Sequence, residues 1–244
     1  MKNMKIIEKM AAKAKDNFNA EGVTIAFLGD SVTQGCFEIY KDENNRIETV
    51  FDKRASYEMR VFDIFCTLFP SVTVNIVNAG ISGDTAPHGS LRVEKDVLRH
   101  QPDLCVVCYG LNDCGMGEES VVKYTAALRD IFGKVRENGA ELIFMTPNMM
   151  NTTVSSRLTD PDFIAIANQC ARKQNDGTFD AHIDAARELC LEMHIPLCDC
   201  YTLWKHLSEG GVDTTHLLAN HINHPTREMN KMFAYELVKT MFLS

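Results

Sequence analysis

The stretch VTIAFLGDSVTQG, residues 23–35, carries the pattern that decides the fold. Its first six residues form an apolar run rich in β-branched and aromatic side chains, and Gly29 ends that run directly before Asp30 and Ser31. A short apolar run bounded by glycine and polar residues is typical of a buried strand. We therefore predict a strand over 23–28, followed by a tight turn that presents Ser31.

Four more runs of this kind follow along the chain, and longer amphipathic patterns separate them. Strands that are apolar throughout and alternate with helices indicate an α/β protein, with a parallel sheet covered by helices on both faces. The predicted strands are 23–28, 72–77, 103–109, 141–145 and 195–200, and the predicted helices are 3–18, 54–68, 86–99, 118–137, 180–193 and 226–242.

The composition indicates a well-packed protein that does not bind nucleic acid. The chain has 244 residues, of which 45% are hydrophobic, and its 33 acidic against 25 basic side chains give a formal net charge of −8. A chain of this size and composition can bury a large core, and no linker-like stretch divides it, so we expect a single domain over 1–244. Duplex binding depends on basic side chains, which disfavours a nucleic-acid partner.

Neither a membrane anchor nor a disulfide framework is expected. The first 18 residues lack the long apolar core of a secretory signal, and no run approaches the roughly 18 apolar residues of a membrane span. The nine cysteines are odd in number and scattered, which fits a reducing compartment. We therefore expect a cytoplasmic protein that does not contact membranes. The sequence leaves its oligomeric state open.

Small and polar residues collect directly after the first three predicted strands. Parallel sheets form their sites beyond the carboxyl ends of the strands, and these three strand ends are expected to be neighbours. A fourth polar segment precedes the last helix and contains the densest group of histidines. The four segments are GDSVTQG (29–35), NAGISGDT (78–85), GLND (110–113) and NHINHP (220–225).

Acyl transfer is the chemistry that these four segments can perform together. A serine hydroxyl becomes a strong nucleophile when a base removes its proton, and a neutral imidazole suits that task near pH 7. Ser31 is the candidate nucleophile and His224 the candidate base. The tetrahedral intermediate needs donors aimed at its negative oxygen. We expect these from the backbone N–H groups of Ser31 and Gly83 and from the Asn112 amide.

In this order, the four segments resemble the SGNH hydrolases, also called GDSL-type esterases or lipases. GDSVTQG carries Ser31, NAGISGDT carries Gly83, GLND carries Asn112 and NHP carries His224. The resemblance spans 29–225 and implies a flavodoxin-like three-layer α/β/α sandwich without a cofactor, for which we expect a five-stranded parallel sheet in the order 2-1-3-4-5. It also implies an ester hydrolase with Ser31 as nucleophile, His224 as base and an oxyanion hole formed by Ser31, Gly83 and Asn112.

The C-terminal segment departs from the family at one position. The family has an aspartate three residues before the catalytic histidine, and here that residue is His221. The aspartate fixes the imidazole tautomer and stabilises the imidazolium. Three arrangements stay open: a backbone carbonyl or Asn220 orients His224, Asp213 reaches the ring from upstream, or the pair works as a Ser–His dyad. We favour a dyad with a carbonyl or another weak group as its third member.

Two other functions stay open on the sequence alone. His216, His221 and His224 are candidate zinc ligands of a metal-dependent hydrolase. The turn over 31–35 is a candidate phosphate or flavin site of a non-catalytic flavodoxin-like binding module. We favour the serine esterase, and we expect a small acetyl or short-chain ester as substrate because no large apolar surface or membrane anchor is evident.

Two further features have both a functional and a purely structural interpretation. The segment 148–180 is longer than a plain crossover. It is either a lid or substrate rim, or an inserted helix that only covers one edge of the sheet. Cys105 and Cys108 have the spacing of a metal or redox pair, but within a strand they point to opposite faces, so we predict that both pack in the core.

Overall fold

The centre of the molecule is a parallel sheet, seen in a computed structural model that describes residues 3–115, 117 and 119–243. All four strand pairings are parallel, and the spatial order is the predicted 2-1-3-4-5. The predicted α/β fold with a five-stranded sheet is therefore confirmed. In spatial order, the strands are β4 (Val74–Gly80), β1 (Val23–Gly29), β5 (Leu104–Cys108), β6 (Glu141–Met145) and β7 (Leu197–Cys198).

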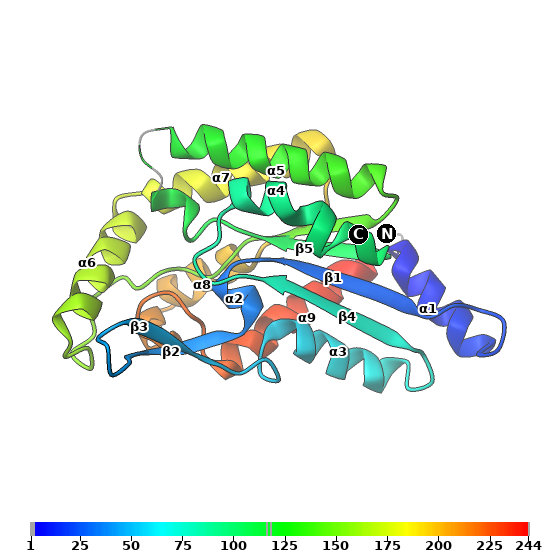
Figure 1. The fold of residues 1–244 in the computed structure, drawn as a ribbon, viewed down its shortest axis with the longest axis horizontal. Coiled ribbons are helices and arrows are strands. Elements are labelled where there is room, and N and C mark those ends of the chain that lie inside the picture. Colours follow the sequence, from blue (N-terminus) through cyan, green and yellow to red (C-terminus); the bar gives the residue numbers. More distant parts are fainter. Residues whose placement is uncertain (1–2, 116, 118, 244) are drawn as a thin grey trace.

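Two apolar cores lie on opposite faces of the sheet. Ile25 and Phe27 belong to one core and Ala26 and Leu28 to the other, because successive strand side chains point to opposite faces. Such a sheet needs helices on both sides, as Figure 1 shows. The first face is covered by α1 (Lys5–Lys15), α3 (Tyr57–Leu68), α8 (Cys200–Glu209) and α9 (Arg227–Leu243), and the second mainly by α4 (Ala86–Asp96), α5 (Ser120–Glu137) and α7 (Thr178–Met193).

Most of the cysteines are buried core residues. Cys105 and Cys108 are buried in different cores, which confirms the predicted packing. Burial raises the pKa of the Cys105 thiol to about 12, so this thiol stays protonated. All nine cysteines lie in the described part of the chain and are free thiols. Among the described helices, none combines the length and the apolar character that a membrane crossing needs.

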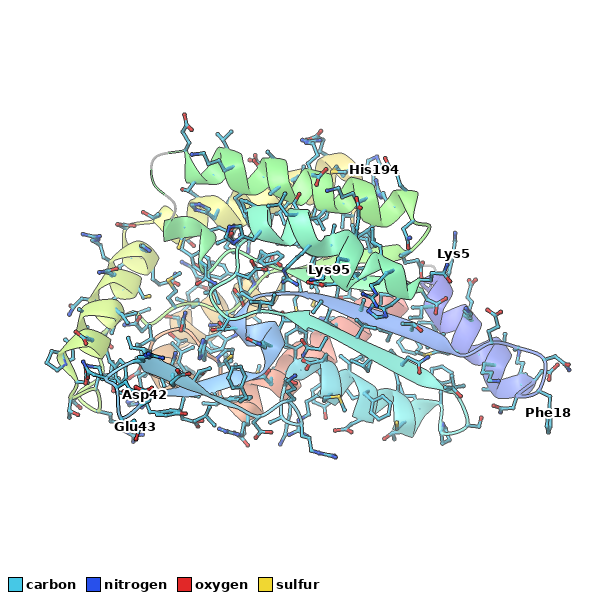
Figure 2. All side chains as sticks on the ribbon, in the orientation of Figure 1. Lys5, Phe18, Asp42, Glu43, Lys95 and His194 are labelled. Atoms are coloured by element: carbon cyan, nitrogen blue, oxygen red, sulfur yellow. The ribbon has the colours of Figure 1, made fainter. Side chains whose placement is uncertain are left out.

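Several short elements gather beyond the carboxyl ends of the strands, far from α1 (Figure 1). Lys41 ties two of them together through ion pairs of 2.9 Å to Asp160 and 2.7 Å to Asp162. Figure 2 shows Asp42 and Glu43 at the tip of the β2–β3 hairpin, at the opposite end of the molecule from Phe18. The elements at this end are α2 (Ser31–Gln34), the hairpin strands β2 (Cys36–Lys41) and β3 (Ile47–Phe51), and α6 (Pro161–Asn175).

The structure departs from the sequence prediction in a few elements. The β2–β3 hairpin was not predicted. The strand predicted over 195–200 is much shorter, because Asp199 accepts a hydrogen bond from the Thr202 N–H and so begins α8 at Cys200. Three single turns of 3-10 helix complete the described elements: η1 (Leu98–His100), η2 (Asp113–Gly115) and η3 (Thr214–Leu217).

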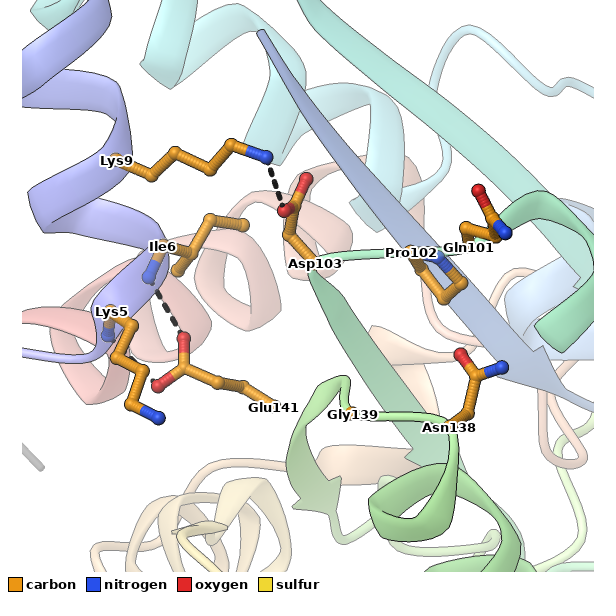
Figure 3. Close-up of a pocket in the computed structure, with 9 residues that line it drawn as sticks. All are labelled: Lys5, Ile6, Lys9, Gln101, Pro102, Asp103, Asn138, Gly139 and Glu141. Carbon is orange, nitrogen blue, oxygen red and sulfur yellow. Dashed lines mark hydrogen bonds and ion pairs between the residues drawn. The ribbon is translucent and has the colours of Figure 1, made fainter. Parts of the chain in front are cut away.

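At the amino end of the sheet, α1 is tied to the residues that begin β5 and β6 (Figure 3). Glu141 accepts hydrogen bonds of 2.8 Å from the backbone N–H groups of Lys5 and Ile6, and so caps the helix. Lys9 forms an ion pair of 2.8 Å with Asp103. A cavity of about 320 Å³ lies between these groups, and its other lining residues are Gln101, Pro102, Asn138 and Gly139.

Candidate active site

Ser31 lies in the first turn of α2, where the chain leaves strand β1 of the central sheet. Asp30 caps this short helix by accepting a hydrogen bond of 3.0 Å from the Val32 N–H. The helix lies so close to the end of β4 that a Cβ on Gly80 would come within 2.3 Å of the Gln34 nitrogen. This close approach, which only glycine allows, fixes the buried Ser31 at the carboxyl edge of the sheet.

His224 reaches Ser31 from the other end of the sequence. Its Nε2 lies 3.0 Å from the Ser31 Oγ, and its Nδ1 lies 2.8 Å from the carbonyl oxygen of Phe37. Because a carbonyl only accepts hydrogen bonds, this contact assigns the proton to Nδ1 and leaves Nε2 to accept from the serine. Ser31 and His224 thus have the arrangement of a nucleophile and its base.

The surroundings of His224 keep its ring neutral. Burial lowers the pKa of His224 below its ordinary value of 6.5, while the hydrogen bond to Phe37 and the charge of Glu38 act in the opposite direction. His224 as a whole is only 6% exposed. A neutral imidazole near pH 7 can accept a proton from the serine hydroxyl.

Asn220 holds the loop that carries His224. Its Oδ1 accepts hydrogen bonds of 2.9 to 3.0 Å from the backbone N–H groups of Ile222, Asn223 and His224. From the neighbouring segment, the Asn148 amide donates to the Asn223 carbonyl at 2.8 Å. Asn220 therefore shapes the loop and does not contact the imidazole nitrogen, in contrast to one of the arrangements considered from the sequence.

Asp213 does not face His224 either. Its Oδ1 accepts a hydrogen bond of 3.0 Å from the Thr215 N–H, and its Oδ2 lies 3.5 Å from the Nδ1 of His216. The carboxylate caps η3 and is about half exposed. The Nδ1 of His224 therefore contacts the Phe37 carbonyl and no carboxylate.

The three histidines do not converge on one point. His221 has a positive φ of 56°, and its ring packs edge-on against His216 with centroids 6.2 Å apart. Both ring nitrogens of His224 are engaged by Ser31 and Phe37. Within the described ranges, no three histidine, cysteine or carboxylate side chains are grouped as a metal would require. The geometry thus favours the serine–histidine pair over the zinc site.

The predicted oxyanion donors follow the ends of three adjacent strands. Gly83 has a φ of +77°, a conformation that favours glycine, and described atoms leave open space where its Cβ would lie. The Asn112 Nδ2 donates to the Asp84 carbonyl at 2.9 Å, which leaves its second N–H for a ligand. Among the described residues, the backbone N–H groups of Ser31 and Gly83 have no acceptor.

A partly buried ion pair anchors the loops that carry these donors. Arg92 binds the Oδ2 of Asp84 through Nε at 2.8 Å and Nη2 at 2.6 Å, and Tyr109 donates to the same oxygen at 2.8 Å. Arg92 also donates to the carbonyls of Gly29 and Ala79. No local sequence pattern marks Arg92 for this role, because its partners come from three separate segments.

Two other carboxyl groups beside the site are buried. Burial raises the pKa of Asp30 to about 7 and that of Asp113 to about 6, and the charge of Asp84 adds to both shifts. Asp30 caps α2, and the Oδ1 of Asp113 accepts a hydrogen bond of 2.9 Å from the Ala86 N–H. These contacts give both carboxyl groups an anchoring role. His88, which follows the Gly83 loop, is largely exposed.

The segment 148–180 lies next to the His224 loop and the hairpin. It begins with the Asn148 contact described above, and its Asn151 N–H donates to the Ile222 carbonyl at 2.8 Å. The segment continues into α6, which lies beyond the carboxyl ends of the strands (Figure 1). No contact between α6 and Ser31 or His224 is among the described interactions, so the prediction that α6 forms the rim of the site stays a prediction.

Comparison with known proteins identifies related sequences. Residues 27–232 match the model of the GDSL-like Lipase/Acylhydrolase family. An acetylxylan esterase from Geobacillus stearothermophilus is 26% identical over 165 residues, which are 63% of this chain and 74% of that protein. An arylesterase from Vibrio mimicus is 29% identical over 97 residues, which are 37% of this chain and 48% of that protein.

Solved structures show the same fold. A crystal structure of an acetylxylan esterase from Geobacillus stearothermophilus has a TM-score of 0.67 at 20% identity, and the match covers 92% of this chain and 96% of that one. A gut microbial diltiazem-metabolizing enzyme has a TM-score of 0.66 at 20% identity, covering 91% of this chain and 47% of that one. At these identities the similarity concerns the arrangement of the elements.

Proposed function

This chain belongs to the GDSL-like lipase/acylhydrolase family, also called the SGNH hydrolases, and we propose that it is a serine esterase that acts on small acyl esters. As a member of this family, related to acetylxylan esterases, it is a carboxylic ester hydrolase. The observation that supports the finer proposal best is the 3.0 Å contact between the Ser31 Oγ and the His224 Nε2. The tautomer of His224 is the one that general-base catalysis needs.

In the proposed acylation step, the Ser31 Oγ attacks the carbonyl carbon of the ester while His224 Nε2 takes its proton. The electron pair of the carbonyl π bond moves onto oxygen, which accepts hydrogen bonds from the N–H groups of Ser31, Gly83 and Asn112. The tetrahedral intermediate then collapses. The bond to the alcohol breaks, and His224 gives its proton to the leaving oxygen.

Deacylation repeats these steps with water as the nucleophile. His224 Nε2 takes a proton from water, whose oxygen attacks the acyl carbon bound to Ser31. The bond between the acyl carbon and the Ser31 Oγ breaks, and the serine regains its proton from His224. The acid is released, and the enzyme returns to its starting state.

The Phe37 carbonyl takes over part of the role of the missing aspartate. It accepts the Nδ1–H of His224 and so holds the ring in the reactive tautomer, but it lacks a full negative charge to stabilise the imidazolium. The nearby charge of Glu38 raises the pKa of His224 and therefore acts in the direction of an aspartate. We accordingly describe the machinery as a Ser–His dyad with a carbonyl as its third member.

An acetyl or short-chain acyl group fits the proposal best. Ser31 is 4% exposed, so little of its surface is open to a bulky acyl group. The name of the related acetylxylan esterase states acetylxylan as its substrate. We propose that the alcohol part is a soluble sugar, and that α6 with the loop before it forms the rim of its site.

A panel of p-nitrophenyl esters from acetate to palmitate, together with an acetylated xylose, tests the substrate class. We expect the highest kcat/KM for acetate or butyrate, and a clear preference for palmitate would contradict the proposal. A serine-directed phosphonate should inactivate the enzyme by labelling Ser31, while a chelator should leave the activity unchanged. Inactivation by the chelator alone would support the metal-dependent alternative. The Ser31→Ala variant, which should not be labelled, is the control.

A further inference from the structure

The carbonyl that accepts the hydrogen bond from His224 belongs to a hairpin outside the central sheet. Phe37 lies in β2, which pairs only with β3 among the described strands. Most residues of β3 are exposed. A two-stranded hairpin is only marginally stable by itself, so its backbone needs another support to hold a carbonyl in place.

Arg227 supplies contacts to the hairpin from the first turn of α9. Its guanidinium lies 4.3 Å from the centre of the Phe37 ring. Its Nη1 and Nη2 donate to the two carboxylate oxygens of Glu38 at 2.6 and 3.1 Å, and its Nε donates to Asp52, directly after β3, at 2.9 Å. One side chain therefore contacts both strands of the hairpin or their immediate continuation.

The same arginine lies three residues after His224, in a segment that is itself well fixed. The carbonyl of His224 accepts a hydrogen bond of 2.7 Å from the Ala219 N–H, and Thr226 donates to the Leu217 carbonyl at 2.8 Å. Further along α9, Phe233 is fully buried in the core. Arg227 thus connects the segment that carries the His224 imidazole to the hairpin whose carbonyl orients that imidazole.

We propose that Arg227 is a positioning residue, which holds the Phe37 carbonyl at the Nδ1 of His224 and so supports the orientation that an aspartate provides elsewhere in the family. The inference rests on the proposed function of the Ser31–His224 pair. The planar guanidinium can stack on a ring and bind a carboxylate through two nitrogens at once, which a lysine cannot do. Arg227 also lowers the pKa of Glu38 and keeps this carboxylate charged beside the site.

Replacement of Arg227 by methionine tests the proposal against a matched control. Arg187 has similar chemistry away from the site: it pairs with Asp184 and Asp199 and lies 5.8 Å from the Tyr201 ring. We expect Arg227→Met to lower kcat about ten- to hundredfold with KM within about twofold, because small displacements of a catalytic group are costly. Arg187→Met should keep kcat within about twofold, and Arg227→Lys should recover part of the loss.

A second readout is independent of turnover. The Nδ1 proton of His224, assigned by its absence in His224→Ala, should give a low-field proton NMR signal in the wild type and in Arg187→Met. In Arg227→Met this signal should be lost or exchange faster with water. If Arg227→Met retains both kcat within twofold and the signal, or loses kcat while the signal is unchanged, the proposal is overturned.

The two proposals fail in distinguishable ways. A wild type that hydrolyses no ester would refute the proposed function, while the NMR comparison would still decide whether Arg227 orients His224. Circular dichroism checks that each variant is folded. If Arg227→Met does not fold, Arg227→Lys is judged by the same signal and by a loss in kcat of at least about fivefold at unchanged KM, and wild-type values for both would overturn the proposal.

Discussion

Charged and polar groups lie at both ends of the central sheet. At the amino end these groups are bound to one another or to α1, whereas at the carboxyl end several donors have no partner among the described residues. At the amino end, both oxygens of Glu141 accept hydrogen bonds from the start of α1, and Lys9 is paired with Asp103 (Figure 3). A cavity of about 320 Å³ lies between them. These groups are occupied with holding the helix, so the cavity has a structural explanation.

At the carboxyl end, several donors are left for a ligand. The backbone N–H groups of Ser31 and Gly83 have no acceptor within the described residues, and Asn112 uses one of its two amide protons. The Ser31 hydroxyl lies beside a neutral imidazole. Unengaged donors therefore surround the candidate nucleophile at the carboxyl end, whereas the charged groups around the cavity at the amino end are bound to the helix or to each other.

The largest expected effect comes from removing either member of the pair at the carboxyl end. Ser31→Ala and His224→Ala should each lower kcat by about 10⁴-fold or more, and the double variant should be no worse than the poorer single one, because the two groups act as a unit. Steady-state assays with the best ester of the panel measure this. Asp103→Asn at the amino end is the control and should keep kcat within about twofold. Additive losses in the double variant would speak against a shared step.

The second-largest loss of kcat is expected from removing the side-chain donor of the proposed oxyanion hole. Asn112→Ala removes one donor to the developing negative charge, so we expect kcat to fall by about 10²–10³-fold while KM changes little. Asn138→Ala, which changes the same residue type at the cavity of the amino end, should leave kcat unaltered. A loss confined to KM in Asn112→Ala would mean that the amide binds the ground state and the transition state equally.

The central sheet could be predicted from the sequence, and the residues of the candidate site could be proposed from it, because each has a local signal. Five apolar runs mark the strands, and Ser31, Gly83 and Asn112 each follow one of them. A buried strand and the polar turn behind it are encoded within about ten residues, so no distant contact is needed to identify them. The topology then brings these turns together.

The sequence favoured a carbonyl as the third member beside His224, but it could not identify which residue supplies it. The partner is the backbone carbonyl of Phe37, and a backbone atom carries no signal of residue type. The contacts of Arg227 to Glu38 and Asp52 join residues 189 and 175 positions apart, so no sequence window contains them. The hairpin itself did leave a trace, since Asn45, with a φ of +60°, lies between two runs of strand-forming residues.

A smaller effect is expected in the pH dependence of kcat/KM, which reports on the protonation of His224 at the carboxyl end. His224 must be neutral to act as the base, and burial lowers its pKa below the ordinary value of 6.5. We expect kcat/KM to be constant near neutrality and to fall about tenfold per pH unit only below a midpoint that lies under pH 6.5. A pH–rate profile measures this midpoint. Burial raises the pKa of Asp30 to about 7, so this carboxyl group is a second group that could cause the fall at low pH. We expect Asp30→Asn to retain the fall of kcat/KM at low pH (the acid limb of the profile). Loss of the limb in this variant would assign it to Asp30.

The smallest effect on activity is expected at the amino end, where the contacts act on stability. Glu141→Ala removes the acceptor for two backbone N–H groups at the start of α1, which should cost about 1–2 kcal/mol of unfolding free energy and lower Tm by a few degrees. Thermal unfolding measures this loss, and Glu137→Ala, at an exposed position, controls for the removal of a carboxylate. Because α1 lies at the far end of the sheet from α2, the helix that begins at Ser31 (Figure 1), kcat per folded molecule should stay within about twofold of the wild type. Phosphonate titration counts the folded molecules. A large fall in kcat at unchanged stability would show that the two ends are coupled, and the division of the sheet into a structural and a reactive end would then be wrong.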